Sequence, residues 1–249
     1  MNKIGREKII YVLEASFKKW HSSRLRRLLI NPYFTLRNSI TARVFKALKL
    51  NFTPNKEINT IHGEKMIINM PHHPDLWTYG AYLEDPEMRM TKFILKNVAD
   101  NITFFDLGSN LGYYSLLVSK ISKNSKIFAF EPDPNNLKIL NKNKKNNITI
   151  IPRAVSDRRG LSELYLGEVA HSDISTLNME NIKLVSLDKK LNNKIKIETI
   201  TLDGFIKNNK IIPDLMKIDV EGSEEKVLIG AKNLLKNKNP IILMEVWIN

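Results

Sequence analysis

The chain has 249 residues, enough for one sizeable domain with an extension, and 43% of them are hydrophobic, which excludes an intrinsically disordered protein. It contains no cysteine, so disulfide bonds, thiolate metal sites and cysteine nucleophiles are excluded. Uninterrupted apolar runs reach about five residues, far from the roughly 20 that cross a bilayer, and no signal-peptide pattern is visible, so we expect a cytoplasmic protein.

A basic segment opens the chain. Residues 1–49 contain twelve Lys or Arg and only two acidic residues, whereas the whole chain has a net charge of +13. Within residues 4–30, apolar residues recur at helical spacing and basic residues fill many of the positions between them. This pattern predicts a basic helical extension over residues 1–50, made of one or two amphipathic helices.

Three roles are open for this extension. Its apolar stripe can dock on the rest of the protein and leave the basic face in water, which is the interpretation that we favour. The helix can instead lie on an anionic membrane surface, as a peripheral contact through residues 1–30, or bind a nucleic acid. We rank the membrane second and nucleic acid lowest. Basic amphipathicity alone discriminates only weakly between these partners.

Residues 51–100 are predicted to form a linker and a lead-in helix. The stretch over residues 51–80 looks irregular, and a turn-like segment at residues 70–75 contains two prolines. His72 and His73 are adjacent there, but adjacent side chains diverge and no further ligands follow at a usable spacing. We therefore predict no metal site.

From residue 102 onward, short apolar segments alternate with segments of helical periodicity. This rhythm predicts a mostly parallel sheet with helices on both faces, because strands buried on both faces are almost continuously apolar. The candidate strands are residues 102–107, 126–131, 148–155, 214–219 and 240–246. The candidate helices are residues 86–98, 112–122, 134–145 and 223–235, and residues 161–201 indicate a β-rich insertion.

A glycine-containing turn follows the first of these strands. Gly108 and Gly112 allow the backbone to come close to a ligand, and the next helix begins with free N–H groups that favour an anionic group. Ser109 and Asn110 lie within the same turn, and Asp106 precedes it. We predict that this turn binds a cofactor.

The acidic residue Glu131 ends the second strand, where a carboxylate can accept both hydroxyls of a ribose. A nicotinamide dinucleotide is disfavoured, because the central glycine of its three-glycine fingerprint is absent and Asp106 would repel a pyrophosphate. Asp106 would instead attract the ammonium and the sulfonium of S-adenosylmethionine. The alternative is a turn that only closes a βα unit, but the joint pattern of Asp106, the glycines and Glu131 favours S-adenosylmethionine.

Seven segments between residues 100 and 246 carry a resemblance to a known family. They are residues 105–115, 130–132, 154–157, 201–205, 217–224, 230–231 and 242–246. Through them the sequence resembles the FkbM family of S-adenosylmethionine-dependent methyltransferases. The resemblance implies a class I methyltransferase (Rossmann-like) fold with a mostly parallel sheet over residues 101–249. It also implies O-methylation, often of sugars or other small metabolites.

The sequence departs from the class I pattern in two places. That fold normally continues after its fifth strand with a helix and an antiparallel hairpin, whereas this sequence ends at Asn249, just after that strand. We expect either a truncated protein or a reduced sheet whose exposed edge is covered by a partner or by the N-terminal extension. Class I enzymes often have Asp or Asn after the third strand for the adenine, whereas here Arg153 precedes Ala154, so we assign that contact to the main chain at Ala154 or to Asp157.

The expected reaction is an SN2 displacement, in which the protein aligns the nucleophile and a base accepts a hydroxyl proton. Asp219 and Glu221 follow the fourth strand, and ligands of open α/β sheets bind at the carboxyl ends of strands. These two carboxylates are candidate bases; the structural alternative is that they bond loop amides or hold Lys217. His171, in the insertion, is a third candidate base.

Three functions remain open. The first is O-methylation of a sugar, a glycan or another small metabolite, with that acceptor as the expected partner. The second is a nucleic-acid methyltransferase recruited by the basic N-terminus, although no motif for amino methylation is present and cytosine C5 chemistry lacks its cysteine. The third is a non-catalytic, degenerate cofactor-binding module without the C-terminal strands. The oligomeric state is not indicated by the sequence.

Overall fold

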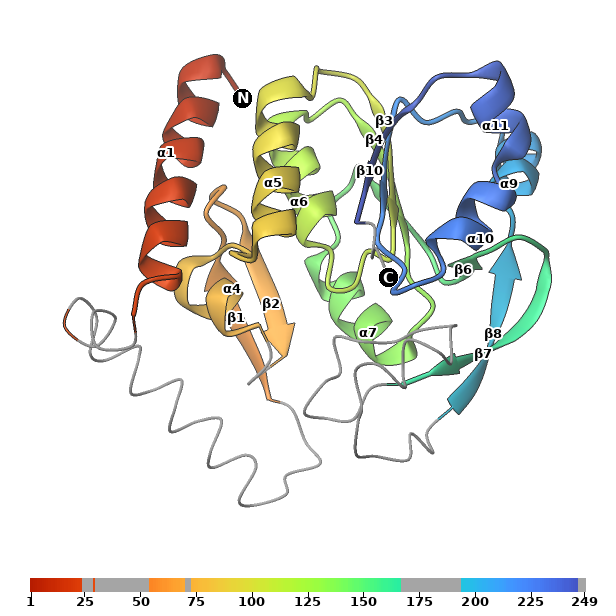
Figure 1. The fold of residues 1–249 in the computed structure, drawn as a ribbon, viewed down its shortest axis with the longest axis horizontal. Coiled ribbons are helices and arrows are strands. Elements are labelled where there is room, and N and C mark those ends of the chain that lie inside the picture. Colours follow the sequence, from red (N-terminus) through yellow and green to blue (C-terminus); the bar gives the residue numbers. More distant parts are fainter. Residues whose placement is uncertain (24–28, 30–53, 70–72, 167–193, 246–249) are drawn as a thin grey trace. The chain divides into compact units, whose positions relative to one another are not determined.

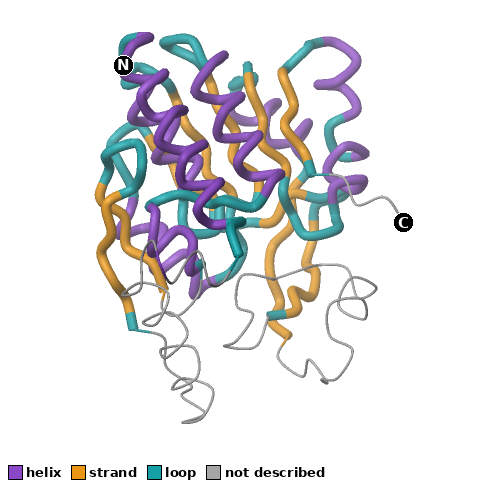
Figure 2. Tube along the Cα trace, turned by 60° about the vertical axis from the view of Figure 1, so that its left-hand side comes forward, coloured by secondary structure: helices purple, strands orange, loops and turns teal. Residues whose placement is uncertain are grey.

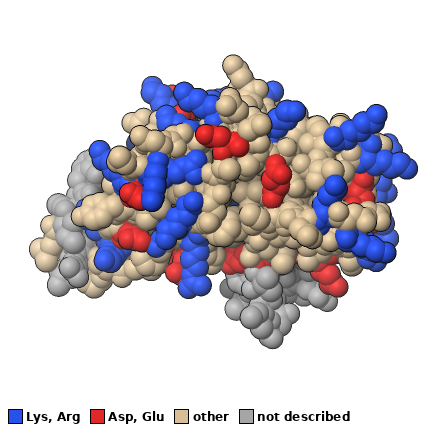
Figure 3. Space-filling view, turned by 90° about the horizontal axis from the view of Figure 1, so that it is seen from above, with Lys and Arg blue, Asp and Glu red and all other residues tan. Residues whose placement is uncertain are grey.

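The computed structural model describes residues 1–23, 29, 54–69, 73–166 and 194–245 (Figure 1). The chain divides into two compact units, residues 1–98 and residues 99–249. Within the described residues, no helix is both long enough and apolar enough to cross a membrane. Lys and Arg side chains are spread over the face drawn in Figure 3, with acidic side chains between them. Most of the basic residues of the predicted extension lie outside the described residues.

The first unit begins with α1 (Lys3–Trp20), where the Asn2 side chain accepts a hydrogen bond from the Gly5 N–H at 3.0 Å. The buried residues of α1 are Ile9, Leu13 and Ser16, and the helix packs against α5 (Asp85–Asn97). Glu14 of α1 also pairs with Lys92 of α5. The amphipathic helix predicted from the spacing is therefore present over the described part, and its apolar stripe packs within the first unit.

The prediction that residues 51–80 are irregular was wrong. They contain an antiparallel hairpin of β1 (Asn55–Asn59) and β2 (Lys65–Asn69), followed by α4 (Pro74–Tyr79). The hairpin forms because Ile58, Met66 and Ile68 alternate with polar residues and face one buried side. His73 precedes α4 in a left-handed conformation, and His72 lies outside the described residues.

The second unit contains a five-stranded parallel sheet, as the sequence predicted. Its strands are β3 (Thr103–Leu107), β4 (Lys126–Phe130), β5 (Ile148–Ile151), β9 (Leu215–Ile218) and β10 (Ile241–Met244). They lie in the order β10-β9-β3-β4-β5, and every neighbouring pair is parallel. The order reverses between β3 and β9, since the chain first builds the sheet outward through β4 and β5 and then returns to the other side.

Helices cover both faces of this sheet (Figure 1, Figure 2). They are α6 (Tyr113–Ile121), α7 (Pro134–Asn143), α9 (Leu202–Asn209), α10 (Glu224–Ile229) and α11 (Lys232–Asn237). The side chains of Phe105 and Leu107 pack in one core cluster with residues of α9, α10 and α11. Because side chains alternate along a strand, Asp106 points to the opposite face, where α6 contacts β3 and β4.

The helix predicted over residues 223–235 is divided into α10 and α11. The break lies at Gly230, where an added Cβ would be 2.1 Å from the Ser156 carbonyl oxygen. The Asp203 carboxylate then accepts the N–H groups of Asn233 and Leu234 at the start of α11. This close approach of two backbones, and not the helical periodicity, sets the helix boundary.

A small second sheet contains β6 (Ala154–Val155), β7 (Gly160–Tyr165) and β8 (Lys194–Ile200), in the order β6-β8-β7. Residues 148–155 therefore form two strands and not one, and the break falls at Pro152, which has no N–H to donate to a ladder. The β-rich insertion is present in its described parts. The predicted candidate base His171 lies outside the described residues.

Candidate functional site

A cavity lies at the carboxyl ends of β3, β4 and β9, where the strand order reverses. This is the position at which open α/β sheets bind ligands. The described residues that line it are Gly108, Asn110, Phe130, Glu131, Pro132, Asn136, Arg153, Ala154, Val155, Leu164, Asp219, Val220 and Glu221. The cavity is small, about 70 Å³, so a nucleoside-sized ligand would extend beyond it.

The turn after β3 passes very close to the chain after β9. Gly108 has φ 74°, and an added Cβ there would lie 1.9 Å from the Asp219 carbonyl oxygen. Its N–H and that of Ser109 both donate to the Phe130 carbonyl at 3.0 Å, which fixes the turn against β4. Gly112, with φ 90°, precedes α6, and a Cβ there would meet the Leu140 side chain at 2.6 Å. Glycine is therefore required at both ends of the turn.

Glu131 is held in the cavity wall by N–H donors. Its Oε2 accepts the Asn110 N–H at 2.8 Å, and its Oε1 accepts the Asp133 N–H at 2.9 Å and the Asn136 side-chain amide at 3.4 Å. The residue is only 4% exposed. Burial raises the pKa of Glu131 to about 7, although the backbone donors act in the opposite direction. Its carboxyl group is thus fixed in position and titrates near neutral pH.

Asp106 and Lys217 are direct neighbours on β3 and β9. Asp106 is fully buried; its Oδ2 accepts the Ser115 hydroxyl of α6 at 2.6 Å, and its Oδ1 lies 3.8 Å from the Lys217 Nζ. The same Nζ donates to the Gly108 carbonyl at 3.1 Å and lies 3.0 Å from the Asp219 Oδ2. One buried ammonium therefore joins the glycine turn to a carboxylate on β3 and to another just after β9.

The charges in this buried group depend on each other. Burial alone would lower the pKa of Lys217, but the negative charges of Asp219 and Asp106 outweigh it and raise that pKa above its usual value. Lys217 is therefore a cation. Burial raises the pKa of Asp106, against the attraction of Lys217 and the hydrogen bond from Ser115. The charge of Asp106 thus depends on Lys217.

Two acidic residues follow β9 at the cavity. Asp219 is 31% exposed at its side chain and has one oxygen bound to Lys217. Glu221 has a left-handed backbone with φ 52°, which is strained for a non-glycine residue. The next turn is fixed by Glu224, whose Oε1 accepts the N–H groups of Val220 and Gly222 at 3.1 Å. Glu221 is thereby held at the cavity wall.

The structure brings six of the predicted site residues together in the cavity wall. These are Gly108, Asn110, Glu131, Ala154, Asp219 and Glu221. Four others lie outside the described lining: Asp106, Ser109, Gly112 and Asp157. Asp106 is covered because it faces α6, and Asp157 accepts the Ser156 hydroxyl at 3.0 Å. Direct contact of these four with a ligand stays a prediction, and so does the role of His171.

Sequence reasoning missed several lining residues, of which Arg153 and Asn136 are polar. Arg153 comes two residues after the end of β5, at the same carboxyl edge as Asp219, and this position was the available signal. Asn136 lies in the first turn of α7, next to Glu131. Within the described residues, no group of three or more His, Asp or Glu side chains is arranged to hold a metal ion.

Known proteins similar to this chain are methyltransferases. It is 28% identical to the hexuronic acid methyltransferase AglP of Haloferax volcanii over 159 residues, which cover 63% of this chain and 61% of that protein. The chain therefore spans less than two thirds of the length of this curated relative.

Two solved structures also match. One is precorrin-6y C5,15-methyltransferase from Geobacter metallireducens, at 15% identity and a TM-score of 0.33, covering 59% of this chain and 55% of that one. The other is TYW2 from Pyrococcus horikoshii in complex with MeSAdo, at 14% identity and a TM-score of 0.31, covering 50% and 49%.

The family comparison covers most of the parallel sheet. The sequence model described as the methyltransferase FkbM domain matches residues 106–247, from the end of β3 to the residues after β10. The match includes the glycine turn, Glu131, and the segment from Lys217 to Glu224. With more than half of its length matched in this way, the chain belongs to the methyltransferase FkbM domain family.

Proposed function

We propose that this protein transfers the methyl group of S-adenosylmethionine to an oxygen atom of a sugar or glycan. The observation that carries the proposal is the narrow turn at Gly108 beside the fixed carboxyl group of Glu131, at the edge of the sheet where the strand order reverses. Membership of the FkbM family supports it. The relative named as a hexuronic acid methyltransferase supports a sugar acceptor.

The residues present fit S-adenosylmethionine. Gly108 and Asn110 of the turn line the cavity beside Glu131, which offers carboxylate oxygens for ribose hydroxyls. The lining contains Glu131, Asp219 and Glu221 against a single described cation, Arg153, so a sulfonium is favoured over an anionic cofactor. When bound, the cofactor supplies a methyl group that its sulfonium has already activated.

The acidic residues after β9 are the candidates for handling the acceptor proton. Asp219 is paired with Lys217 at 3.0 Å, so one of its oxygens is already neutralised. Glu221 lines the same cavity on a constrained backbone. We therefore assign Glu221 as the base that accepts the hydroxyl proton and Asp219 as the group that orients the acceptor.

Incubation with methyl-labelled S-adenosylmethionine tests this function. Fractions of glycan, lipid-linked sugar and RNA are offered separately, and incorporation is measured in each. We expect label in a sugar-containing fraction, and expect Glu221→Gln to reduce the rate at least tenfold and by a larger factor than it weakens cofactor binding. Label in RNA alone would make the protein a nucleic-acid methyltransferase, and cofactor binding without transfer to any fraction would make it a non-catalytic module.

The raised pKa of Glu131 gives opposite pH dependences for stability and cofactor binding. The pKa of Glu131 is about 7 in the folded protein and 4.5 ordinarily, so between pH 4.5 and pH 7 the folded protein binds more protons than the unfolded chain. The stability that this extra proton contributes is present at low pH and is lost as the pH rises through 7. Ribose hydroxyls donate to the ionised form, so affinity should rise about tenfold from pH 6 to pH 8. Calorimetric titration with S-adenosylmethionine and thermal unfolding over that range measure both effects.

Two variants make this result interpretable. Glu131→Gln cannot ionise, so its cofactor affinity should be weaker and nearly independent of pH. Glu225→Gln makes the same chemical change at an exposed position of α10 and should behave like the unchanged protein. A steep pH dependence that persists in Glu131→Gln would show that another group titrates.

A further inference from the structure

A second cavity lies in the second unit, beside the small sheet. Its volume is about 460 Å³, within the range of roughly 300–1,000 Å³ typical of small-molecule sites. The described residues that line it are Ile151, Arg153, Arg159, Gly160, Leu161, Glu198, Thr199, Ile200, Thr201, Gly204, Phe205, Asn208 and Asn209. They come from the end of β5, from β7 and β8, and from α9.

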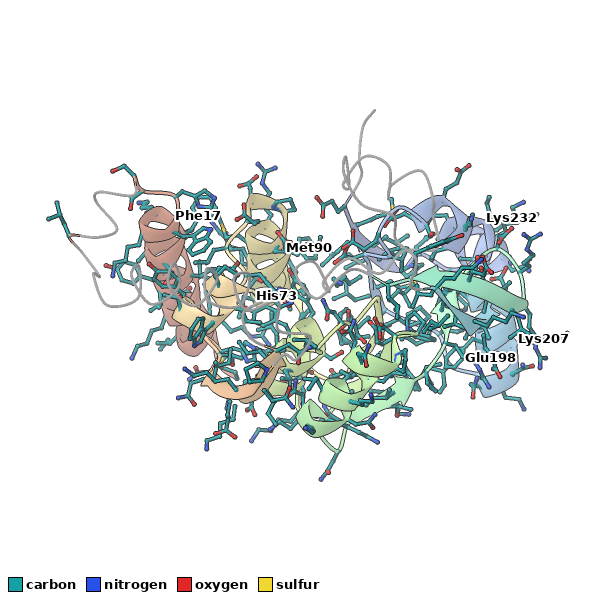
Figure 4. All side chains as sticks on the ribbon, turned by 90° about the horizontal axis from the view of Figure 1, so that it is seen from below. Phe17, His73, Met90, Glu198, Lys207 and Lys232 are labelled. Atoms are coloured by element: carbon teal, nitrogen blue, oxygen red, sulfur yellow. The ribbon has the colours of Figure 1, made fainter. Side chains whose placement is uncertain are left out.

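Arg153 connects this cavity to the first one, because it lines both. Its Nε donates to the Glu198 Oε2 at 2.7 Å, and Glu198 lies on β8 (Figure 4). Among described residues, that is the one acceptor of this guanidinium, so its terminal N–H groups are available to a ligand. Arg153 therefore lies in the wall that the two cavities share, where it can contact a ligand of either.

The second cavity combines positive charge with an apolar floor. Arg159 is exposed and forms no ion pair with the acidic residues that the structure describes. Glu198, which pairs with Arg153, is the single acidic residue in the described lining, against two arginines. Ile151, Ile200 and Phe205 supply apolar surface, and Asn208 adds an amide. The apolar face of a sugar ring can pack on the apolar surface, and an anionic group can bind the arginines.

We propose that this cavity is the acceptor subsite and that it binds an acidic sugar through Arg153 and Arg159. The proposal rests on the proposed function, since it names the class of acceptor for the same site. The anionic group is a carboxylate or a phosphate, which arginine recognises through paired N–H groups in either case. The acidic sugar unit of the acceptor binds in the second cavity, and a neighbouring oxygen of the same acceptor reaches the first cavity, where it accepts the methyl group.

Binding of defined oligosaccharides tests the proposal without any need for turnover. The probes are tetragalacturonate, the same tetramer fully methyl-esterified, and a phosphorylated maltotetraose, each titrated calorimetrically into the full chain with saturating S-adenosylhomocysteine. We expect tetragalacturonate or the phosphorylated sugar to bind at least tenfold more tightly than the ester, and expect the tighter of the two to identify the anionic group. Its affinity should fall as salt is added.

Arg158 provides a matched control next to Arg159. It is exposed and carries the same charge, but it does not line the cavity. Arg159→Gln and Arg153→Gln should each weaken binding of the acidic probe at least fivefold, whereas Arg158→Gln should change it less than twofold. Thermal unfolding checks that each variant folds. Equal losses in Arg158→Gln and Arg159→Gln, binding of the ester as tight as that of both anionic probes, or no binding of any probe would each overturn the proposal.

The labelled-methyl assay separates failure of this inference from failure of the proposed function. Acidic-probe binding that depends on Arg159, without methyl transfer to any sugar, would keep the subsite and reject the reaction. Transfer to a neutral glycan at the same rate in Arg159→Gln as in the unchanged protein would keep the reaction and reject the subsite.

Discussion

Replacing Gly108 by alanine is expected to destabilise the protein by about 3 kcal/mol or more and to abolish binding of S-adenosylmethionine. Two costs add. The backbone at φ 74° is unfavourable for any residue with a Cβ, and the new methyl group would lie 1.9 Å from the Asp219 carbonyl oxygen. That neighbour is backbone, fixed in turn by Asp219 N–H donation to the Leu107 carbonyl at 3.1 Å, so it cannot move aside without opening the sheet.

Gly63 separates the two costs. Its φ is 82°, but no atom lies within 4 Å of the position that a Cβ would take. Gly63→Ala should therefore cost only the conformational part, about 1 kcal/mol, with cofactor affinity unchanged. Thermal unfolding and calorimetric titration of both variants measure the difference. Equal destabilisation by the two substitutions would contradict the close approach at Gly108.

The elements that the sequence predicted correctly are specified by local signals. The helix at residues 134–143 was expected to begin at Asp133 and Pro134, and the Asp133 side chain does accept the Asn135 N–H at 2.8 Å. The five strands of the parallel sheet were recognisable because they are almost continuously apolar, and β3, β4 and β9 are buried along nearly their whole length. Each of these signals is contained within about ten residues of chain.

What the sequence did not indicate depends on contacts between distant residues. Asp106 was expected at the ligand because it precedes a glycine turn, yet its register partner on β9 is Lys217, and both side chains turn towards α6. The division of residues 223–235 depends on the approach of Gly230 to Ser156, more than 70 residues away in sequence. Strand alternation gives two possible faces, and only the assembled sheet decides which one a side chain takes.

The same limit applies to Arg153. Its place after β5 indicated the ligand edge of the sheet. Its partner Glu198, however, lies on β8, 45 residues further along the chain, and the sequence does not show that the two residues meet. The second cavity therefore could not be predicted. The hairpin of residues 55–69 was a different failure, because the alternation around Ile58, Met66 and Ile68 was present in the sequence and was not used.

Replacing Lys217 by methionine is expected to lower the free energy of unfolding by about 3–5 kcal/mol, because it leaves the buried Asp106 without its cation. Asp219 suffers less, since it is partly exposed and water can solvate it. Loss of the hydrogen bond to the Gly108 carbonyl should also loosen the glycine turn and weaken cofactor binding. Denaturant unfolding and calorimetric titration measure the two effects. Lys226→Met, at an exposed position of α10, is the control and should change stability by less than about 0.5 kcal/mol.

The double variant Asp106→Asn with Lys217→Met identifies the cause. If the loss comes from an unpaired buried carboxylate, removing that charge should restore most of the stability, so the two substitutions are strongly non-additive. The pH dependence has a definite sign. In Lys217→Met the raised pKa of Asp106 makes the folded protein bind more protons than the unfolded chain. The free energy of unfolding should therefore increase as the pH falls towards the pKa that Asp106 has in the unfolded chain. Asp106→Asn should remove that dependence. Additive losses with no change in pH dependence would mean that Lys217 stabilises the sheet by packing alone, and that Asp106 needs no cation.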